Sequence, residues 1–232
     1  MKHTMKHTIL IGTSLALSAL ASHAAITLVN GDFEDTSGTF PTGWSGTATQ
    51  ETTNPLEGLV SASAVAIEQD FAATDADGLY NFQLDFMVKL DSVTALNQRV
   101  RIRDDASSSY DIITLRFGSG GIDRYSGGWA QAVASTIKAD TTYHVRVIGS
   151  DLDQSDRSYT VGISSDGSSY TTSGPLTAFH SAGVGSNFEI IRFESAGGGA
   201  TWDAVTVVPE PSAAVLLGSL LGFGLLYRRR RS

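Results

Sequence analysis

The sequence contains no cysteine among its 232 residues. This absence excludes disulfide bonds, a thiolate nucleophile and a lipid-modified cysteine anchor. Histidine is almost as scarce, because only His144 and His180 lie outside the first 24 residues. Two histidines are too few for a histidine-based metal site unless distant carboxylates complete it.

Familiar catalytic and phosphate-binding motifs are missing as well. The chain has no Gly-x-Ser-x-Gly turn for a nucleophile, and no Glu-x-Asp-x-x-Glu strand for glycoside hydrolysis. Glu189 and Glu194 are five residues apart, so they do not share one face of a regular strand. The run 118–121 resembles a phosphate loop, but no lysine or helix follows it. These absences predict that the protein is not an enzyme.

Positive charge is scarce in the body of the chain. The sequence has 16 Lys and Arg against 24 Asp and Glu. Two of the lysines lie at the N-terminus and four arginines at the C-terminus, which leaves the body at about −14. A body this acidic argues against nucleic-acid binding and leaves room for calcium.

The N-terminus has the three parts of an export signal. Lys2 and Lys6 precede an apolar run at 9–21, and Ser22-His23-Ala24 places small residues at the −3 and −1 positions of a cleavage site. This pattern predicts a secretory signal peptide at 1–24, removed by signal peptidase. The sequence therefore predicts an exported protein that begins near Ala25.

The C-terminus combines a proline motif, an apolar run and a basic end. The residues are Val208, Pro209, Glu210, Pro211 and Ser212, then the apolar run 213–227, then Arg228, Arg229, Arg230, Arg231 and Ser232. Fifteen helical residues cover about 22 Å, against a hydrocarbon core of about 30 Å. The run is therefore a marginal membrane span. Its arginines are expected to stay on the cytoplasmic side.

This tail resembles the PEP-CTERM sorting signal of Gram-negative bacteria, and the resemblance covers residues 208–232. It implies recognition by an exosortase, with Val208, Pro209, Glu210 and Pro211 as recognition residues. It also implies an inner-membrane intermediate, cleavage near the motif, and release to the outer surface or an exopolysaccharide matrix.

The body, residues 25–207, reads as β-strands without an amphipathic helix. The clearest strand is 79–90, where Tyr80, Phe82 and Leu84 begin a strict alternation with polar residues. Further alternating segments lie at 99–103, 113–117, 143–147, 159–163 and 205–208. Alternating strands with one polar face predict one all-β domain, a two-sheet antiparallel β-sandwich of the jelly-roll or concanavalin A-like kind.

Three short motifs make the body resemble carbohydrate-binding sandwiches. Residues 30–34 and 41–44 resemble the opening of jelly-roll carbohydrate-binding modules, and 202–207 resembles their closing strand. The segment 142–163 is similar to concanavalin A-like and laminin-G-like sandwiches. These resemblances imply the fold more than any particular ligand.

The jelly-roll resemblance implies a structural calcium between the first and last strands. The matching residues are Glu34 and Asp203, with Asp32 as a further candidate. Asp203 alternates in phase with Val205 and Val207, which predicts that its carboxylate faces the core and needs a partner or a cation. The alternative is that water or a backbone amide satisfies Asp203. No other cofactor is predicted.

Aromatic and basic residues supply two candidate glycan contacts. Trp129 with nearby Tyr125 is the best candidate for an exposed aromatic platform, whereas Trp44 and Trp202 are expected to pack in the core. Arg99, Arg101 and Arg103 form a basic row, with Arg116 and Arg146 on possible neighbouring strands. That row could meet an anionic polysaccharide. The alternative is a solvated face whose arginines pair with carboxylates such as Asp85.

These observations predict an exosortase-processed protein of a bacterial surface or exopolysaccharide matrix, with a non-catalytic structural or glycan-binding role. The competing hypothesis is a secreted glycoside hydrolase or lyase with an unrecognised site. A surface protein that interacts specifically only with the sorting machinery is a third hypothesis.

Overall fold

The computed structural model of the chain describes residues 28–38, 40–71, 79–104, 111–180, 187–195 and 199–209. The predicted signal peptide, the apolar run 213–227 and the basic end 228–232 lie outside the described residues, as do Glu210 and Pro211. Within the described ranges, no helix is long and apolar enough to cross a bilayer.

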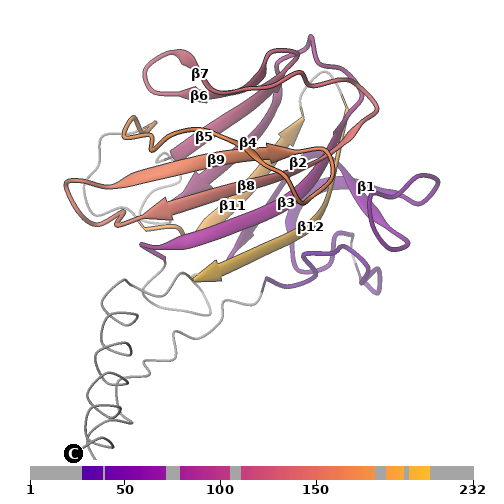
Figure 1. Cartoon of the computed structure of the whole chain (residues 1–232). Helices are drawn as coiled ribbons and strands as arrows, with labels where there is room; N and C mark the ends of the chain where they lie inside the picture. Colours follow the sequence, from indigo (N-terminus) through magenta and orange to yellow (C-terminus); the bar gives the residue numbers. More distant parts are fainter. Residues whose placement is uncertain are drawn as a thin grey trace, which may run out of the picture. The chain divides into compact units, whose positions relative to one another are not determined.

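The described residues form antiparallel strands joined by turns, so the predicted all-β fold class is confirmed (Figure 1). In these ranges the strands are β1 (Ser45–Glu51), β2 (Ser61–Asp70), β3 (Phe82–Leu90), β4 (Gln98–Arg103), β5 (Asp111–Gly118), β6 (Gly121–Tyr125), β7 (Trp129–Ala134), β8 (Thr142–Ser150), β9 (Ser158–Ser164), β10 (Thr171–Thr172), β11 (Ile190–Ser195) and β12 (Ala200–Pro209).

One ladder of hydrogen-bonded strands runs through the domain in the order β10-β9-β8-β3-β12-β2-β11-β4-β5-β6-β7, and β1 pairs with β2. Figure 1 shows this ladder folded into two layers, with β9, β8, β3 and β12 in front of β2, β11, β4 and β5. β12 joins the layers, because it pairs with β3 along most of its length and with β2 at two residues. The arrangement is that of a β-sandwich.

Strand alternation places the core between the two layers. Along β3 the side chains alternate between buried and half-buried, beginning with buried Phe82 and Leu84. Phe86 of the front layer packs against Phe193 and Phe117 of the rear layer, with ring centroids 5.4 and 6.5 Å apart. Trp202 is fully buried in contact with all three rings.

The two tryptophans expected in the core lie there. Trp202 is fully buried and Trp44 is nearly so, with its ring 5.9 Å from that of Phe193. The Trp44 indole nitrogen donates to the carbonyl oxygens of Val29 and Asn30, which satisfies its one polar atom. Neither tryptophan is available to a ligand.

The register of the rear layer gathers the polar residues of four strands on its outer face. In β4, Val100 and Ile102 are buried in the core, so Arg99 and Arg101 point to the opposite face. Arg99 is paired with Arg116 of β5, and Arg101 with Arg192 of β11. Residues far apart in the sequence therefore meet on one surface.

The last strand continues into the proline motif. β12 extends through Val208 and Pro209, which are paired with Gln83 and Phe82 of β3. The strand therefore runs two residues past 207, where the sequence suggested that the domain ends. Val208 and Pro209, the first two residues of the motif, are therefore part of the sheet.

Candidate functional site

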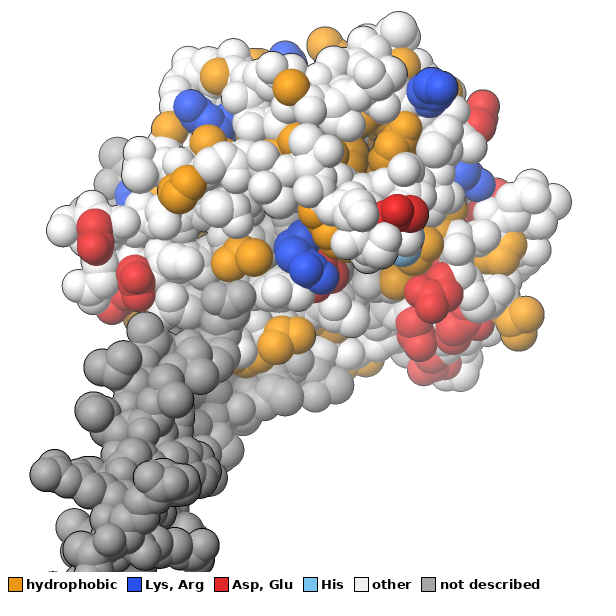
Figure 2. Space-filling view, viewed as in Figure 1, with side chains coloured by type: hydrophobic (Ala, Val, Ile, Leu, Met, Phe, Trp, Pro, Cys, Tyr) orange, Lys and Arg blue, Asp and Glu red, His pale blue; other side chains and the backbone are white. Residues whose placement is uncertain are grey.

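The outer surface of the rear layer interleaves arginines with carboxylates, and we name it the charged face. Its members are Glu68 of β2, Arg192 and Glu194 of β11, Arg99, Arg101 and Arg103 of β4, Asp111, Thr114 and Arg116 of β5, Asp123 and Tyr125 of β6, Trp129 of β7, and His180. The front layer differs, since Figure 2 shows few charged side chains over β9, β8, β3 and β12.

Two of the three predicted glycan-contacting arginines are held by ion pairs. Arg101 donates from Nη1 to Oδ2 of Asp111 at 2.6 Å and from Nε to Oε2 of Glu194 at 2.9 Å. Arg103 donates from Nη1 to Glu68 at 3.1 Å. Pairing with neighbouring carboxylates is the alternative that the sequence left open, and the geometry confirms it for these two arginines.

Arg146 does not belong to this row. It lies on β8 in the other layer, where its Nε donates to Oδ1 of Asp85 at 2.7 Å. This ion pair, together with burial that opposes it, leaves the pKa of Arg146 above its ordinary value. Asp85 therefore neutralises Arg146 and none of the arginines of β4.

Arg99 differs from its neighbours, because it forms no ion pair with any described residue. Its guanidinium carbon lies 5.5 Å from the centre of the Trp129 ring, and that of Arg116 lies 4.2 Å from the same ring. Both distances are typical of cation–π contacts. Trp129 is half-buried and is therefore not a fully exposed aromatic platform. Its ring lies next to Arg99, the arginine without an ion-pair partner among the described residues.

His180 lies on the charged face beside β5. Its backbone N–H donates to the carbonyl oxygen of Ile112 at 2.9 Å, and this bond holds His180 against β5. Its Nδ1 lies 2.7 Å from Oγ1 of Thr114 and 3.3 Å from Oδ2 of Asp111. About 29% of the side chain is exposed.

The hydrogen bonds assign one tautomer to His180. The Thr114 hydroxyl donates to Asp111 at 3.2 Å, so its oxygen is left to accept from the Nδ1–H of His180. The lone pair then resides on Nε2. Burial lowers the pKa of His180, and Arg101 lowers it further against the opposing effect of Asp111. The imidazole is therefore neutral at pH 7 and basic at Nε2.

Tyr125 connects His180 to the tryptophan. Its ring lies 4.5 Å from the His180 ring and 5.2 Å from the Trp129 ring, both in edge-to-face geometry. The charged face thus places a neutral imidazole base, a phenol, an indole and an uncommitted guanidinium in consecutive contact. A base, an acid and a cation without an ion-pair partner are groups that general acid–base chemistry on a negatively charged ligand can use.

The predicted calcium ligands both hold the loop between β1 and β2. Oε1 of Glu34 accepts the N–H groups of Leu59 and Val60 at 2.7 and 3.1 Å. Oδ2 of Asp203 accepts the hydroxyl of Ser61 at 2.5 Å and the N–H of Glu57 at 3.1 Å. Protein donors therefore satisfy oxygen atoms that a calcium ion would need.

Asp203 is buried as expected, but for a different reason. A register shift between Asp203 and Thr206, with a positive φ at Ala204, breaks the alternation on which the phase argument depended. Asp203 is paired with Met87, on the opposite face from Trp202, and the 56–61 loop covers it. Burial raises the pKa of Asp203 to about 6.

These two carboxylates do not make a calcium site by themselves. Calcium takes six to eight oxygen ligands, and no group of three or more acidic or histidine side chains suited to a metal occurs among the described residues. Asp32 contributes only a 3.5 Å contact with the N–H of Glu34. Calcium binding stays a prediction, and a test is given in the Discussion.

Comparison with known proteins finds similarity in structure only. No protein-family model matches the chain, and no curated protein matches its sequence. Solved structures do match. A sialidase has 13% identity and a TM-score of 0.49, and covers 72% of this chain and 17% of its own. A GH43 protein from Bacillus licheniformis has 8% identity and a TM-score of 0.44, and covers 65% of this chain and 33% of its own.

A PL-14 alginate lyase from Aplysia kurodai has 7% identity and a TM-score of 0.48, and covers 70% of this chain and 87% of its own. The chain thus corresponds to about a sixth of the sialidase and a third of the GH43 protein. At such identities the likeness concerns the fold alone.

The prediction that the protein is not an enzyme is contradicted by these neighbours, which are named as enzymes, and it is not retained. It rested on missing linear motifs. A site whose side chains come from four strands and a loop leaves no such motif, because the sheet register brings its members together.

Several residues of the charged face escaped the sequence analysis. His180 entered only as one of two histidines, too few for a metal site without distant carboxylates, and the sequence assigns no role to Asp111, Thr114 or Glu194. One signal was available: Arg192 and Glu194 alternate with buried residues in the way that Arg99 and Arg101 do. That pattern indicates a charged outer face, but it does not reveal which strands are neighbours.

Proposed function

We propose that the protein is a secreted carbohydrate-active enzyme that cleaves an acidic polysaccharide by β-elimination on the charged face. The observation that carries this proposal is the hydrogen-bonded set Asp111–Thr114–His180, which orients a neutral imidazole with its lone pair on Nε2. An imidazole positioned in this way by a carboxylate is suited to be a general base.

The same face favours elimination over hydrolysis. Glycoside hydrolysis uses two carboxyl groups that are free to act as acid, base or nucleophile. Here Glu68, Asp111, Asp123 and Glu194 are each bound to a guanidinium at 3.1 Å or less. None of them is free for that work, whereas the imidazole is.

In the proposed reaction, Nε2 of His180 removes the proton on the carbon next to the carboxylate of a uronate unit. The electron pair first enters the carboxylate group and then forms a carbon–carbon double bond as the glycosidic C–O bond breaks. The phenol of Tyr125 donates a proton to the departing oxygen. Arg99 neutralises the uronate carboxylate, which stabilises the negative charge that develops on it.

The products distinguish the two reactions. Elimination yields an unsaturated sugar whose double bond is conjugated to the carboxylate and absorbs in the ultraviolet, together with a new reducing end. Hydrolysis yields the reducing end without the absorbance. Incubation of the full chain with polygalacturonate, alginate and hyaluronan is expected to produce both signals from at least one polymer. Reducing ends without absorbance would refute elimination, and no products from any polyuronate would refute the proposal.

We also propose that the protein is exported from a Gram-negative bacterium and sorted through its tail. The support is the sequence pattern of a signal peptide at 1–24, the motif at 208–211 and the basic end at 228–231. Signal peptidase and an exosortase would process an inner-membrane intermediate, and the domain would reach the outer surface or an exopolysaccharide matrix. Mass spectrometry of the secreted protein is expected to show a C-terminus near Pro209. A secreted chain that still ends at Ser232 would argue against this processing.

A further inference from the structure

A second polar surface of the domain has a different chemistry from the charged face. It is a cavity of about 530 Å³ where the two ends of the strand ladder, β7 and β10, approach each other without pairing. We name it the seam pocket. Small-molecule sites have volumes of a few hundred to a thousand Å³, so this cavity can hold one or two sugar units.

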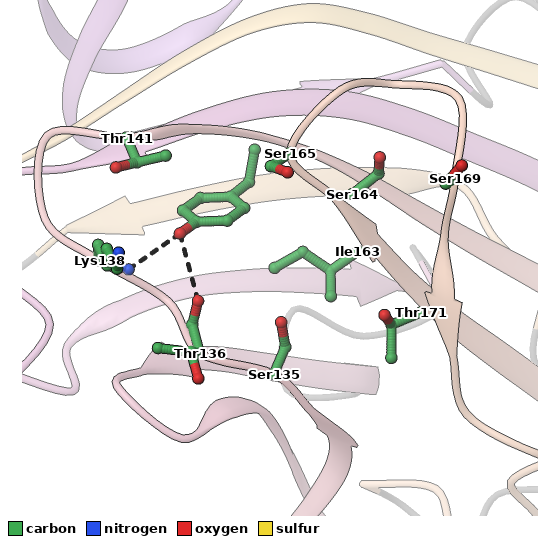
Figure 3. A pocket seen from close by; sticks show the side chains of 10 residues that line it. Ser135, Thr136, Lys138, Thr141, Ile163, Ser164, Ser165, Ser169 and Thr171 are labelled. Carbon is green, nitrogen blue, oxygen red and sulfur yellow. Dashed lines mark hydrogen bonds between the residues drawn. The ribbon is translucent and has the colours of Figure 1, made fainter.

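Hydroxyl groups dominate the seam pocket (Figure 3). Its lining residues are Ser135, Thr136, Lys138, Thr141, Tyr143, Ile163, Ser164, Ser165, Ser169 and Thr171. Eight of these ten side chains carry a hydroxyl, one is an amine and none is a carboxylate. Because a hydroxyl donates one hydrogen bond and accepts two, such a lining is suited to another polyhydroxylated molecule.

Most of these hydroxyls have no protein partner. Among the described residues, the side-chain oxygens of Ser135, Thr136, Ser165, Ser169 and Thr171 make no hydrogen bond within the protein. Ser164 is different, because its hydroxyl donates to Asp166 at 2.7 Å. The free hydroxyls come from both sides of the cavity, so a ligand can contact both walls at once.

Hydrogen bonds also hold the two walls in place. On one wall, the hydroxyl of Tyr143 accepts the N–H of Lys138 at 3.0 Å and donates to the carbonyl oxygen of Thr136 at 3.4 Å, as Figure 3 shows. On the other wall, the Asp166 carboxylate accepts the N–H groups of Ser168 and Ser169 at 2.8 and 2.9 Å. Those bonds lower the pKa of Asp166 well below its usual range.

The structure assigns to the seam pocket a binding site for a neutral glycan of one or two sugar units, separate from the charged face. Prearranged walls reduce the ordering cost of binding. The buried side chains of Ile163 and Tyr143 line the pocket from the core side. The six-residue strand β7 separates Ser135 from Trp129, which corresponds to about 20 Å at 3.3 Å per residue.

Titration of the full chain with cellobiose, maltose and mannobiose tests this site, with heat or NMR shifts as the readout. At least one disaccharide is expected to show saturable binding. Thr171→Trp fills the pocket from β10 and is expected to abolish that binding. Thr172→Trp is the matched control, because the next residue on the strand points away from the cavity. Disaccharide binding that Thr172→Trp keeps and Thr171→Trp loses would support the site.

Two results would overturn the assignment. One is the failure of all three disaccharides to bind, and the other is equal binding by the Thr171→Trp and Thr172→Trp variants. Lys138→Gln adds a test of ligand charge, since binding of a neutral disaccharide should survive the loss of the amine. The outcome is independent of the elimination proposal, because that proposal is tested by products from polyuronates and not by disaccharide binding.

Discussion

The charged face and the seam pocket use polar groups in opposite ways. On the charged face, most charged side chains are paired with a side chain of opposite charge. Asp111, for example, contacts three side chains at once, those of Arg101, Thr114 and His180. In the seam pocket, the hydroxyls of Ser165 and Thr171 have no partner in the described protein. The ion pairs and hydrogen bonds of the charged face fix the orientation of a few reactive atoms, whereas the hydroxyls of the seam pocket can still form hydrogen bonds with a ligand. The following predictions test this difference.

The largest expected effect is on turnover by the charged face. His180→Asn keeps a side chain of similar shape that can donate to Thr114, but it has no basic nitrogen. Loss of a general base typically lowers the rate by about 10²–10⁴-fold. We expect kcat/KM on the cleaved polyuronate to fall at least that far, with disaccharide binding to the seam pocket unchanged. A variant with near wild-type kcat would show that His180 is not the base.

The pH dependence gives an independent check on the same residue. Because the pKa of His180 lies below 6.5, the base is neutral and active at pH 7. Activity should therefore rise with pH through a midpoint below 6.5 and then level off. The same shift means that the unfolded chain binds this proton more tightly, so stability is lost as pH falls below 6.5. A rising limb centred above pH 7 would contradict the assignment.

The next largest effect concerns stability. Asp111→Asn removes the carboxylate between Arg101 and Arg103, and only 7% of this carboxylate is exposed. Loss of one partner of a buried ion pair costs about 3–5 kcal/mol, because the remaining charge stays buried. The free energy of unfolding, measured by urea denaturation, should fall by about 3 kcal/mol.

Two matched variants sharpen that test. Asp123→Asn breaks the more exposed pair with Arg116, in which 28% of the carboxylate is exposed, and should cost less than about 1 kcal/mol. Thr171→Val in the seam pocket removes a hydroxyl without a partner and should cost less than about 0.5 kcal/mol. If all three variants lost the same free energy of unfolding, the ion pairs of the charged face would contribute no more to stability than the hydroxyls of the pocket.

Asp203 extends the comparison to a buried carboxylate whose described partners are hydrogen-bond donors rather than arginines. Its pKa is raised to about 6, so the folded state holds the proton more tightly than the unfolded chain does. The free energy of unfolding should then fall by about 2–3 kcal/mol as pH rises from about 4 to 6. Asp203→Asn should remove this fall, which pH-dependent urea denaturation would detect.

Calcium would reverse that result. An ion bound to Glu34 and Asp203 favours the ionised carboxylates, so added calcium should raise the melting temperature at pH 7 and weaken the fall between pH 4 and 6. Magnesium provides the control for a general effect of divalent ions. No shift with calcium or with a chelator would argue against a calcium ion on these carboxylates and leave them to the backbone N–H groups and the Ser61 hydroxyl that they accept from.

Much of the fold could be predicted from residue alternation. The strands near 79–90, 99–103, 113–117, 143–147 and 159–163 all occur, with ends that differ by a few residues. Alternation failed where a strand is irregular or short. β2 is paired on both sides and shifts register against β1, and β10 has only two residues. Such segments lack the regular alternation of apolar and polar residues from which a strand is predicted.

The charged face was only partly predictable, for a reason that lies in the topology. The row of Arg99, Arg101 and Arg103 follows from alternation within one strand. Its partners depend on which strands are neighbours: β11 lies between β2 and β4, although some 90 residues separate it from β4 in the sequence. Sequence alternation shows which face a residue occupies, but not what lies next to it on that face.

The smallest expected effect separates the two surfaces by their response to salt. Arg99 is half-buried and still partly open to solvent. Its attraction to a uronate carboxylate should therefore weaken as ionic strength rises, because the Debye length falls from about 10 Å at 0.1 M to about 3 Å at 1 M. We expect kcat/KM on a polyuronate to fall a few-fold over that range, while disaccharide binding to the seam pocket stays constant. Arg99→Gln should lower kcat/KM at low salt and remove most of its salt dependence. If the variant kept the full dependence, the ion-paired arginines, rather than Arg99, would be the groups that attract the polymer.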